Sequence, residues 1–170
     1  MKIFLVGFMG VGKTTIGTKL AEALGYRFVD LDKIIEEKEQ MKIAEIFSAK
    51  GEEYFRNLEK DTYFELVATM DMMVMATGGG TPCFFNLIDD MNKQGRTVYL
   101  KASVQTLVQR NEADSNQRPL LSDSKGADLE NKIEDMLQYR ASCYEKAHHT
   151  VEINHFSLEK SLTEIIKLFI

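Results

Sequence analysis

Short apolar segments alternate with amphipathic segments along most of this chain. The apolar segments are bounded by glycine or polar residues, as is typical of strands buried on both faces, and they lie at 2–6, 27–29, 72–76, 97–100 and 150–153. Between them, apolar side chains recur every three or four residues, as at Ile16, Leu20 and Leu24, which indicates helices with one buried face. Strands that alternate with helices predict an α/β domain with a parallel sheet.

Glycines mark the ends of several predicted helices. Gly25 is expected to end the first helix, and Gly51 to separate a short helix near 43–47 from a longer one. The longer helix should run over about 52–70, with apolar positions at Phe55, Leu58, Phe64 and Leu66. Later helices are predicted from 84 to 93 (closed by Gly95), from 104 to 110, from 128 to about 147, and after a capping Ser157.

The segment 7–14 reads Gly-Phe-Met-Gly-Val-Gly-Lys-Thr and matches the phosphate-binding pattern G-x-x-x-x-G-K-[ST]. It stands between a predicted strand and a predicted helix. In that context the glycines let backbone N–H groups turn inward, and the helix N-terminus faces the same point. Lys13 could then reach the outer phosphates of a nucleotide, and the Thr14 hydroxyl could ligate Mg²⁺. A glycine-rich turn without a ligand fits this context poorly, so the sequence predicts a nucleoside triphosphate site.

Two further segments should face the P-loop, because ligands of parallel sheets bind beyond the carboxyl ends of the strands. Asp30 and Asp32 follow the second strand, and in an extended segment this spacing would place both carboxylates on one side. One could help hold Mg²⁺, directly or through water, while the other accepts a proton from an attacking hydroxyl. Alternatively, Asp32 only caps the next helix. In P-loop proteins a metal-binding carboxylate normally ends a second buried strand. The third strand of this chain ends without an acidic residue, so Asp30 is the available substitute.

Gly78–Gly80 follow the third strand. Three consecutive glycines cost conformational entropy, which favours a close approach of the backbone to a ligand over a simple turn.

The segment from 111 to 125 is polar and has no sustained period, and its length is typical of a lid or binding loop. Within it, Arg118 precedes Pro119 and could swing onto a transferring phosphoryl group. Arg56 and Arg140 are the other candidates for anion contacts. If they converged on one small acceptor, that acceptor would carry a carboxylate, but their spacing does not show convergence.

Composition narrows the class of protein. The length of 170 residues suits one domain with a full core, and the net charge of −5 argues against nucleic acid as a partner. No apolar stretch approaches the length of a membrane span. Cys83 and Cys143 are distant in the sequence and fit no metal-binding spacing, so we expect two reduced thiols in a cytoplasmic protein. Without heptads, a monomer is expected.

Several motifs occur together in a characteristic order. They are Gly-Phe-Met-Gly-x-Gly-Lys-Thr-Thr-x-Gly at 7–17, Phe28-Val29-Asp30-x-Asp32, Ile46-Phe47, Gly51-Glu52, Phe55-Arg56, Glu59, Thr77-Gly78-Gly79-Gly80, Tyr99-Leu100, Arg110, Arg118-Pro119-Leu120-Leu121, Arg140 and Tyr144. With this set the chain resembles the shikimate kinases over nearly its whole length.

The resemblance implies a single three-layer α/β/α P-loop kinase domain over 1–170, with a five-stranded parallel sheet. It places the P-loop at 7–14, an acceptor-binding region at about 30–60 and a mobile lid at about 111–126. It further implies transfer of the ATP γ-phosphoryl group to the 3-hydroxyl of shikimate, with Mg²⁺, on the route to chorismate and aromatic amino acids.

The resemblance also implies roles for individual residues. The catalytic groups would be Lys13, Asp32 as the base, and Arg118. ATP would be bound by Gly10, Val11, Gly12, Lys13, Thr14, Thr15, Arg110 and Arg118, with Arg110 packed on adenine. Shikimate would be bound by Asp32, Arg56, Gly78, Gly79, Gly80 and Arg140, the two arginines holding its carboxylate. Thr14 would ligate Mg²⁺, with Asp30 nearby.

Two departures from the family pattern affect the acceptor side. Many members have Arg-x-Pro-x-Tyr where this chain reads Arg140-Ala141-Ser142-Cys143-Tyr144. The absence of the proline loosens the backbone constraint after Arg140. Thr81-Pro82-Cys83 replaces the more usual small or apolar residues after the triple glycine. Neither departure removes a catalytic group.

Other functions fit the residues less well. Gluconate kinases read Asp-Gly-Asp followed shortly by His after the second strand, whereas this chain reads Asp30-Leu31-Asp32-Lys33 with no nearby His. The triple glycine and Arg56 suit a small carboxylate better than the base of a nucleoside monophosphate. A non-catalytic nucleotide-binding switch would be expected to have lost one of Lys13, Thr14, Asp32 or Arg118.

Overall fold

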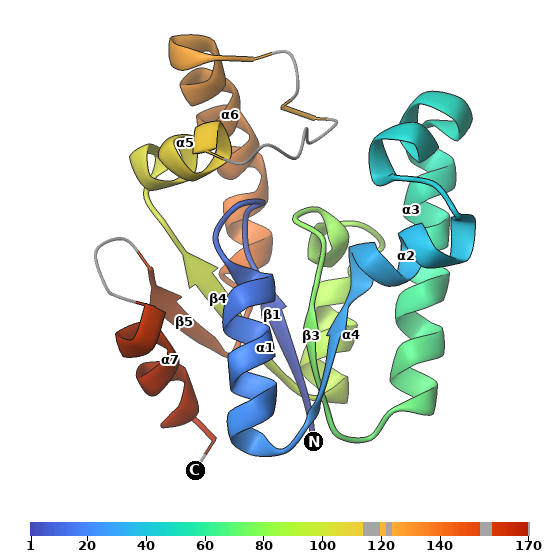
Figure 1. The fold of residues 1–170 in the computed structure, drawn as a ribbon, viewed down its shortest axis with the longest axis vertical. Helices are drawn as coiled ribbons and strands as arrows, with labels where there is room; N and C mark the ends of the chain where they lie inside the picture. Colours follow the sequence, from blue (N-terminus) through green and yellow to red (C-terminus); the bar gives the residue numbers. More distant parts are fainter. Residues whose placement is uncertain (114–119, 122–123, 154–157, 170) are drawn as a thin grey trace.

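Five parallel strands in the order β2-β3-β1-β4-β5 form the centre of the structure, a computed structural model that describes residues 1–113, 120–121, 124–153 and 158–169 (Figure 1). The strands are β1 (Lys2–Val6), β2 (Arg27–Asp30), β3 (Met73–Ala76), β4 (Arg96–Lys101) and β5 (His149–Glu152). All five predicted strands and their parallel arrangement are confirmed, with ends that differ by a residue or two.

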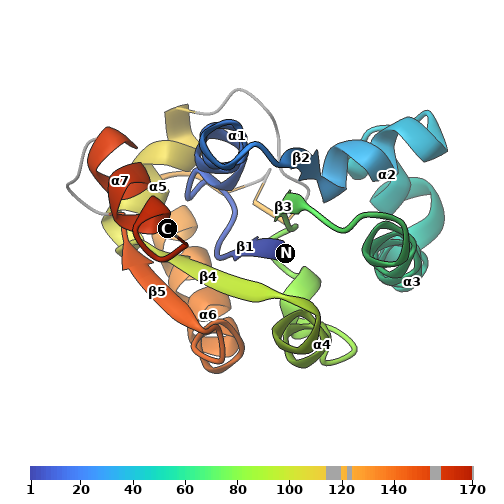
Figure 2. The same cartoon turned by 90° about the horizontal axis from the view of Figure 1, so that it is seen from below.

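Helices cover both faces of this sheet. They are α1 (Lys13–Leu24), α2 (Leu31–Glu39), α3 (Ile43–Thr69), the 3-10 helix η1 (Thr81–Cys83), α4 (Leu87–Gln94), α5 (Val104–Ala113), α6 (Gly126–Tyr144) and α7 (Leu158–Ile166). Figure 2 shows α1 and α7 on one face and α4 and α6 on the other, with α2 and α3 beyond the β2 edge. The predicted three-layer α/β/α kinase fold is therefore confirmed.

The central strand β1 is buried on both sides, as its continuous apolar run predicts. Ile3 and Leu5 pack into the cluster that contains side chains of α1, whereas Phe4 and Val6 pack into a second cluster on the opposite face. In that second cluster the rings of Phe4 and Tyr63 are 5.9 Å apart. The alternation follows from the two-residue period of a strand.

Glycines end or break helices at two of the predicted places. Gly25 adopts a left-handed conformation with φ of 67° after α1, and its N–H bonds the carbonyl oxygen of Glu22. Gly51 has φ of 83° and ψ of 169° and breaks α3 into a short and a long helical part.

Several boundaries and one core position differ from the predictions. The helix predicted at 84–93 begins only at Leu87, because Phe85 and Asn86 have left-handed φ values of 53° and 56° that a helix cannot contain. The predicted lid loses its first residues to α5, which continues to Ala113. The strand predicted from 150 starts at His149. Phe64 is 44% exposed, since Tyr63 takes the inward position on α3.

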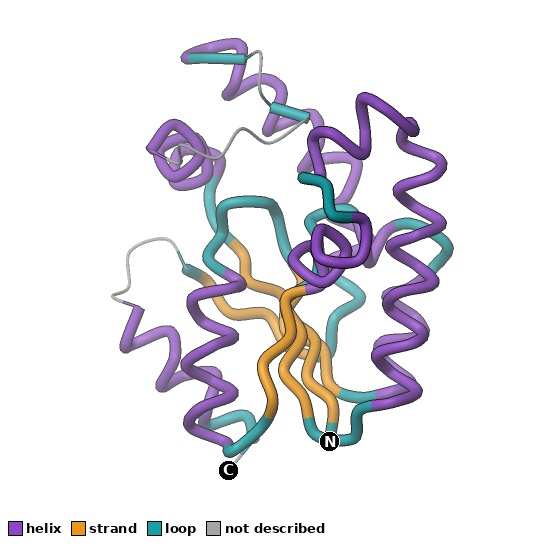
Figure 3. Tube along the Cα trace, turned by 45° about the vertical axis from the view of Figure 1, so that its right-hand side comes forward, coloured by secondary structure: helices purple, strands orange, loops and turns teal. Residues whose placement is uncertain are grey.

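The carboxyl ends of the strands determine where a ligand can bind. Figure 3 shows the loops that follow β1 and β3, and the helix that directly follows β2, gathered at one end of the sheet, opposite the N-terminus. The P-loop, the start of α2 and the triple glycine occupy these positions. None of the helices in the described part of the chain has the length and apolar character needed to cross a bilayer.

We predict that Gly17→Ala destabilises the fold, although Ala is the better helix former by about 1 kcal/mol. A Cβ atom on Gly17 would lie 2.6 Å from Phe28 Cε2 and 3.1 Å from Leu5 Cδ1, so α1 or its neighbours would have to move. We expect the free energy of unfolding in urea to fall by about 1–2 kcal/mol through overpacking. The exposed Lys19→Ala on the same helix is the control and should change it by less than about 0.5 kcal/mol. An increase for Gly17→Ala would show that α1 is not held close to the sheet.

Candidate active site

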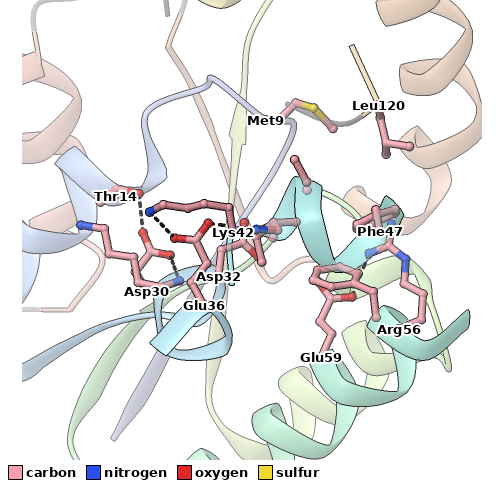
Figure 4. A pocket seen from close by; sticks show the side chains of 17 residues that line it. Met9, Thr14, Asp30, Asp32, Glu36, Lys42, Phe47, Arg56, Glu59 and Leu120 are labelled. Atoms are coloured by element: carbon pink, nitrogen blue, oxygen red, sulfur yellow. Dashed lines mark hydrogen bonds and ion pairs between the residues drawn. The ribbon is translucent and has the colours of Figure 1, made fainter. Parts of the chain in front are cut away.

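Two cavities meet at the carboxyl edge of the sheet. The larger, of about 590 Å³, lies between the P-loop, the triple glycine and helices α2 and α3, and Figure 4 shows its side chains. The smaller, of about 400 Å³, lies along the P-loop and reaches Arg110 on α5. Four residues line both cavities: Thr14, Asp30, Asp32 and Gly79. A group bound in one cavity can therefore touch a group bound in the other.

The P-loop is shaped by left-handed glycines at 7, 10 and 12, with φ values of 140°, 84° and 104°. Lys13 is 8% exposed, and its ammonium group donates to the carbonyl oxygens of Gly7 at 2.8 Å and Phe8 at 3.0 Å. Most of the predicted ATP residues line the smaller cavity: Gly10, Gly12, Lys13, Thr14, Thr15 and Arg110. The side chain of Val11 packs in the core instead.

Thr14 and Asp30, the two predicted Mg²⁺ residues, lie in direct contact. The Thr14 hydroxyl donates to Asp30 Oδ2 at 2.7 Å, and Asp30 Oδ1 accepts the Lys33 N–H at 3.3 Å, which caps α2. A hydroxyl and a carboxylate are oxygen ligands of the kind that Mg²⁺ prefers. Residues 1–113, 120–121, 124–153 and 158–169 contain no cluster of three or more Asp, Glu, His or Cys side chains that could cage a metal. Mg²⁺ in kinases does not need one, because phosphate oxygens and water complete its shell.

The expected geometry of Asp30 and Asp32 is wrong. The segment is not extended, since α2 begins at Leu31 and places Asp32 in its first turn. Asp30 rather than Asp32 caps the helix, because its carboxylate is the one that reaches the Lys33 N–H. Both carboxylates nevertheless line both cavities, next to the positive end of a helix.

Arg56 is held in the wall of the larger cavity by a buried ion pair. It is 5% exposed, and its guanidinium donates to Glu59 Oε2 at 2.8 Å and to Glu52 Oε1 at 3.2 Å. The two carboxylates differ in environment, since the side chain of Glu59 is 1% exposed and that of Glu52 is 50% exposed. The Phe84 ring lies 4.1 Å from the guanidinium carbon.

Glu59 links Arg56 to Thr81, a role that we did not predict from the sequence. Besides Arg56 it binds Thr81, whose hydroxyl donates to Glu59 Oε1 at 2.5 Å. Burial raises the pKa of the Glu59 carboxyl, and the Arg56 charge and the Thr81 hydrogen bond oppose part of that rise. The available signal was its spacing of three residues from Arg56 on a predicted helix, which places the two side chains on one face.

The triple glycine makes room for these side chains. A Cβ atom on Gly78 would lie 2.8 Å from Glu59 Oε1 and 3.0 Å from Asp32 Oδ1, and one on Gly80 would lie 2.7 Å from Arg56 Nη1. We expected the glycine backbone to approach a ligand closely. In the structure it closely approaches the protein's own polar side chains.

Arg140 reaches the same loop from the other side. It lies near the end of α6, is 6% exposed, and its Nη1 would be 3.5 Å from a Cβ atom on Gly79. That Nη1 has no hydrogen-bond partner within the described part of the chain. Arg140 is not among the residues that line the two cavities. Tyr144 fixes α6 here by donating to the Gly79 carbonyl oxygen at 2.5 Å, and the helix runs to Tyr144 without the family's proline.

Helix α5, which leads into the predicted lid, is bound to the P-loop by two consecutive residues. Arg110 Nη1 donates to the Val11 carbonyl oxygen at 2.6 Å. Asn111 Nδ2 donates to the carbonyl oxygens of Met9 at 3.1 Å and Leu107 at 2.8 Å. Nothing in the sequence pattern singled out Asn111. Arg118, the predicted lid arginine, lies outside the described residues.

A family model described as "Shikimate kinase" matches residues 9–169. This chain belongs to the shikimate kinase family. The shikimate kinase of Parabacteroides distasonis is 43% identical over 96% of this chain and 91% of its own length. That of Sulfurihydrogenibium is 40% identical over 96% and 95%.

Solved structures of shikimate kinases also superpose on this chain. The crystal structure of the Bacteroides thetaiotaomicron enzyme has a TM-score of 0.92 at 34% identity and covers 99% of this chain and 97% of that one. A structure of the Acinetobacter baumannii enzyme in complex with shikimate has a TM-score of 0.89 at 39% identity and covers 98% and 91%. The family's reaction is the phosphorylation of shikimate by ATP, so the resemblance and the enzyme class inferred from the sequence are confirmed.

We predict that Glu59→Gln lowers the free energy of unfolding by about 2–4 kcal/mol, because it leaves the buried Arg56 charge without its main partner. Glu52→Gln is the matched control, since it removes the exposed carboxylate that binds the same guanidinium and should cost less than about 1 kcal/mol. Urea unfolding of both variants measures the difference. Equal, small losses would mean that Glu59 does not neutralise Arg56.

Proposed function

We propose that this chain transfers the γ-phosphoryl group of ATP to the 3-hydroxyl of shikimate where its two cavities meet. The observation that carries the proposal is the shared lining by Thr14, Asp30, Asp32 and Gly79. ATP in the P-loop cavity would present its γ-phosphate at this point, and an acceptor in the larger cavity would present its hydroxyl. Such juxtaposition supplies most of the catalysis in phosphoryl transfer.

The larger cavity has the chemistry that a small polyhydroxy acid needs. Arg56 offers a planar pair of donors to a carboxylate, and Asp32 offers an acceptor to hydroxyl groups. Glu52 is the exchangeable partner of Arg56, because it is half exposed and lies farther away than Glu59. A substrate carboxylate can replace Glu52 while Glu59 keeps the guanidinium in place. Arg140 is proposed as the second carboxylate contact, since its Nη1 lies against Gly79.

The residues of the P-loop cavity would bind and polarise the nucleotide. Lys13 exchanges its two carbonyl partners for the β- and γ-phosphates, and Thr15 and the loop N–H groups complete the cradle. Thr14 and Asp30 would hold Mg²⁺, which when bound neutralises charge on the phosphate oxygens. Arg110 lines the far end of this cavity, where the base of ATP would lie. Arg118 is proposed to bring a further positive charge from the lid.

Asp32 is the proposed base. It accepts the proton of the 3-hydroxyl as that oxygen forms its bond to phosphorus, and ADP leaves with the electron pair of the broken P–O bond. The product is shikimate 3-phosphate. The domain limits of 1–170, the cytoplasmic location and the monomeric state inferred from the sequence stay predictions.

The function is tested by measuring ADP release from Mg·ATP in a coupled assay with shikimate, gluconate, AMP or no acceptor. We expect strong stimulation by shikimate alone. Stimulation by gluconate or AMP would refute the assignment of the acceptor cavity. ATP binding without stimulation by any acceptor would favour the nucleotide-binding switch.

We predict that Asp32→Asn lowers kcat by at least about 100-fold, because the amide cannot accept the hydroxyl proton. The dissociation constant for ATP, measured by calorimetry without shikimate, should change less than about threefold, since Lys13 and the loop N–H groups remain. A variant with near-normal kcat would show that Asp32 is not the base.

A further inference from the structure

The two cysteines of this chain, distant in the sequence, lie together beside the acceptor cavity. Cys83 is the last residue of η1, directly after the triple glycine, and Cys143 lies in the last turn of α6. Both are free and partly exposed, and both pack against the same apolar cluster. The two thiols lie close enough for the Cys143 S–H to interact with the Cys83 sulfur.

The contacts around Cys83 and Cys143 fix the two segments that carry them relative to each other. Helices η1 and α6 pack against each other, and the Tyr144 hydroxyl anchors α6 on the carbonyl oxygen of Gly79. Arg140, one turn before Cys143, lies against Gly79 as well. The two cysteines therefore belong to two segments that pack together and are tied to the same glycine loop.

The two thiols are electrostatically unequal. The hydrogen bond from Cys143 lowers the pKa of Cys83, and the charges of Arg140 and Arg56 lower it further, against the effects of burial and Glu59. The same hydrogen bond, with burial, raises the pKa of Cys143. A cysteine with a lowered pKa next to one with a raised pKa is the arrangement in which the first sulfur attacks an oxidant and the second resolves the product.

We propose that Cys83 and Cys143 are an oxidative modification site, at which a hydroperoxide converts the pair to an intramolecular disulfide that weakens shikimate binding. The second half of this statement rests on the proposed function. Neither cysteine takes part in the phosphoryl transfer described above.

The chemistry balances with the hydroperoxide as the only co-reactant. The Cys83 thiolate attacks the terminal oxygen of the hydroperoxide, so that an S–O bond forms, the O–O bond breaks and an alkoxide or hydroxide leaves. The Cys143 sulfur then attacks the Cys83 sulfenic acid, which forms the S–S bond and releases water with the proton of Cys143. The two thiols lose two electrons, and the hydroperoxide gains them.

The disulfide would act on the acceptor side of the site. Its S–S bond of about 2.0 Å is much shorter than a contact between two non-bonded sulfur atoms, so it draws the end of α6 and η1 together. Gly80 and Arg140 each stand three residues before one of the cysteines, and both belong to the proposed carboxylate-binding region. Since small misplacements of binding groups are costly, we expect the KM for shikimate to rise about tenfold. The P-loop cavity does not include either element, so the KM for ATP should stay within about twofold.

The test treats the reduced, full-length protein with hydrogen peroxide and counts free thiols after denaturation, with mass spectrometry to identify an intramolecular Cys83–Cys143 link. We expect both thiols to disappear together and to return with a dithiol reductant. Cys143→Ser should stop at a Cys83 sulfenic acid that dimedone traps, whereas Cys83→Ser should leave Cys143 unreacted under the same conditions. These readouts do not depend on activity, so they separate a failure of this proposal from a failure of the proposed function.

Kinetics before and after oxidation test the consequence. The expected rise in the KM for shikimate should vanish on reduction and be absent in both serine variants, which also show whether the substitutions disturb the reduced enzyme. Retention of both thiols in the wild type, or a link only between separate chains, would overturn the modification site. An unchanged KM for shikimate in a fully disulfide-bonded enzyme would overturn its effect on binding.

Discussion

The acceptor side of this site depends on one buried ion pair, between Arg56 and Glu59. Two charges that are almost completely removed from water are tolerated only when they neutralise each other and their remaining donors and acceptors are satisfied. Thr81 supplies one such partner, and Gly78 and Gly80 leave the space that the carboxylate and the guanidinium fill. The triple glycine, η1 and α3 are thus fixed relative to one another by electrostatics as much as by apolar packing. Arg56 is therefore held in one position in the wall of the larger cavity.

Much of the fold could be predicted because the signals are local. The strand segments are apolar enough to be identified as strands without knowledge of the strands they pair with. Gly25 ends a helix and Gly51 breaks one through their own backbone conformations. Phe85 and Asn86 could not be predicted, since their left-handed conformations are imposed by the surrounding structure and neither residue requires them. The helical start at Leu31 could not be predicted for a different reason: a capping carboxylate is a local signal, but either Asp30 or Asp32 could have served.

The residues of the site also differ in how far the sequence alone reveals them. That the P-loop residues, Asp30 and Asp32 line a cavity could be predicted, because residue type, position after a strand and family motif agree, whereas Arg56 was placed by its motif alone. Asn111 and the Cys83–Cys143 contact depend on which elements the fold brings together. An asparagine in a polar segment has no pattern of its own, and two cysteines far apart in sequence carry no pairing information. The convergence of Arg56 and Arg140 on the glycine loop is likewise a property of α3 and α6 packing on opposite sides of it.

The carbonyl oxygens of the P-loop explain how its N–H groups remain directed at an anion. Those of Gly7 and Phe8 accept from Lys13, that of Met9 from Asn111, and that of Val11 from Arg110. With these oxygens held by cationic or amide donors, the opposite side of the peptide groups presents its positive ends to the cavity. Independently of Lys13, Asn111 and Arg110 hold the loop, and both belong to α5. The Thr14–Asp30 bond ties the same loop to the acceptor side. The P-loop is therefore the common support of α5 on one side and of Asp30, at the start of α2, on the other.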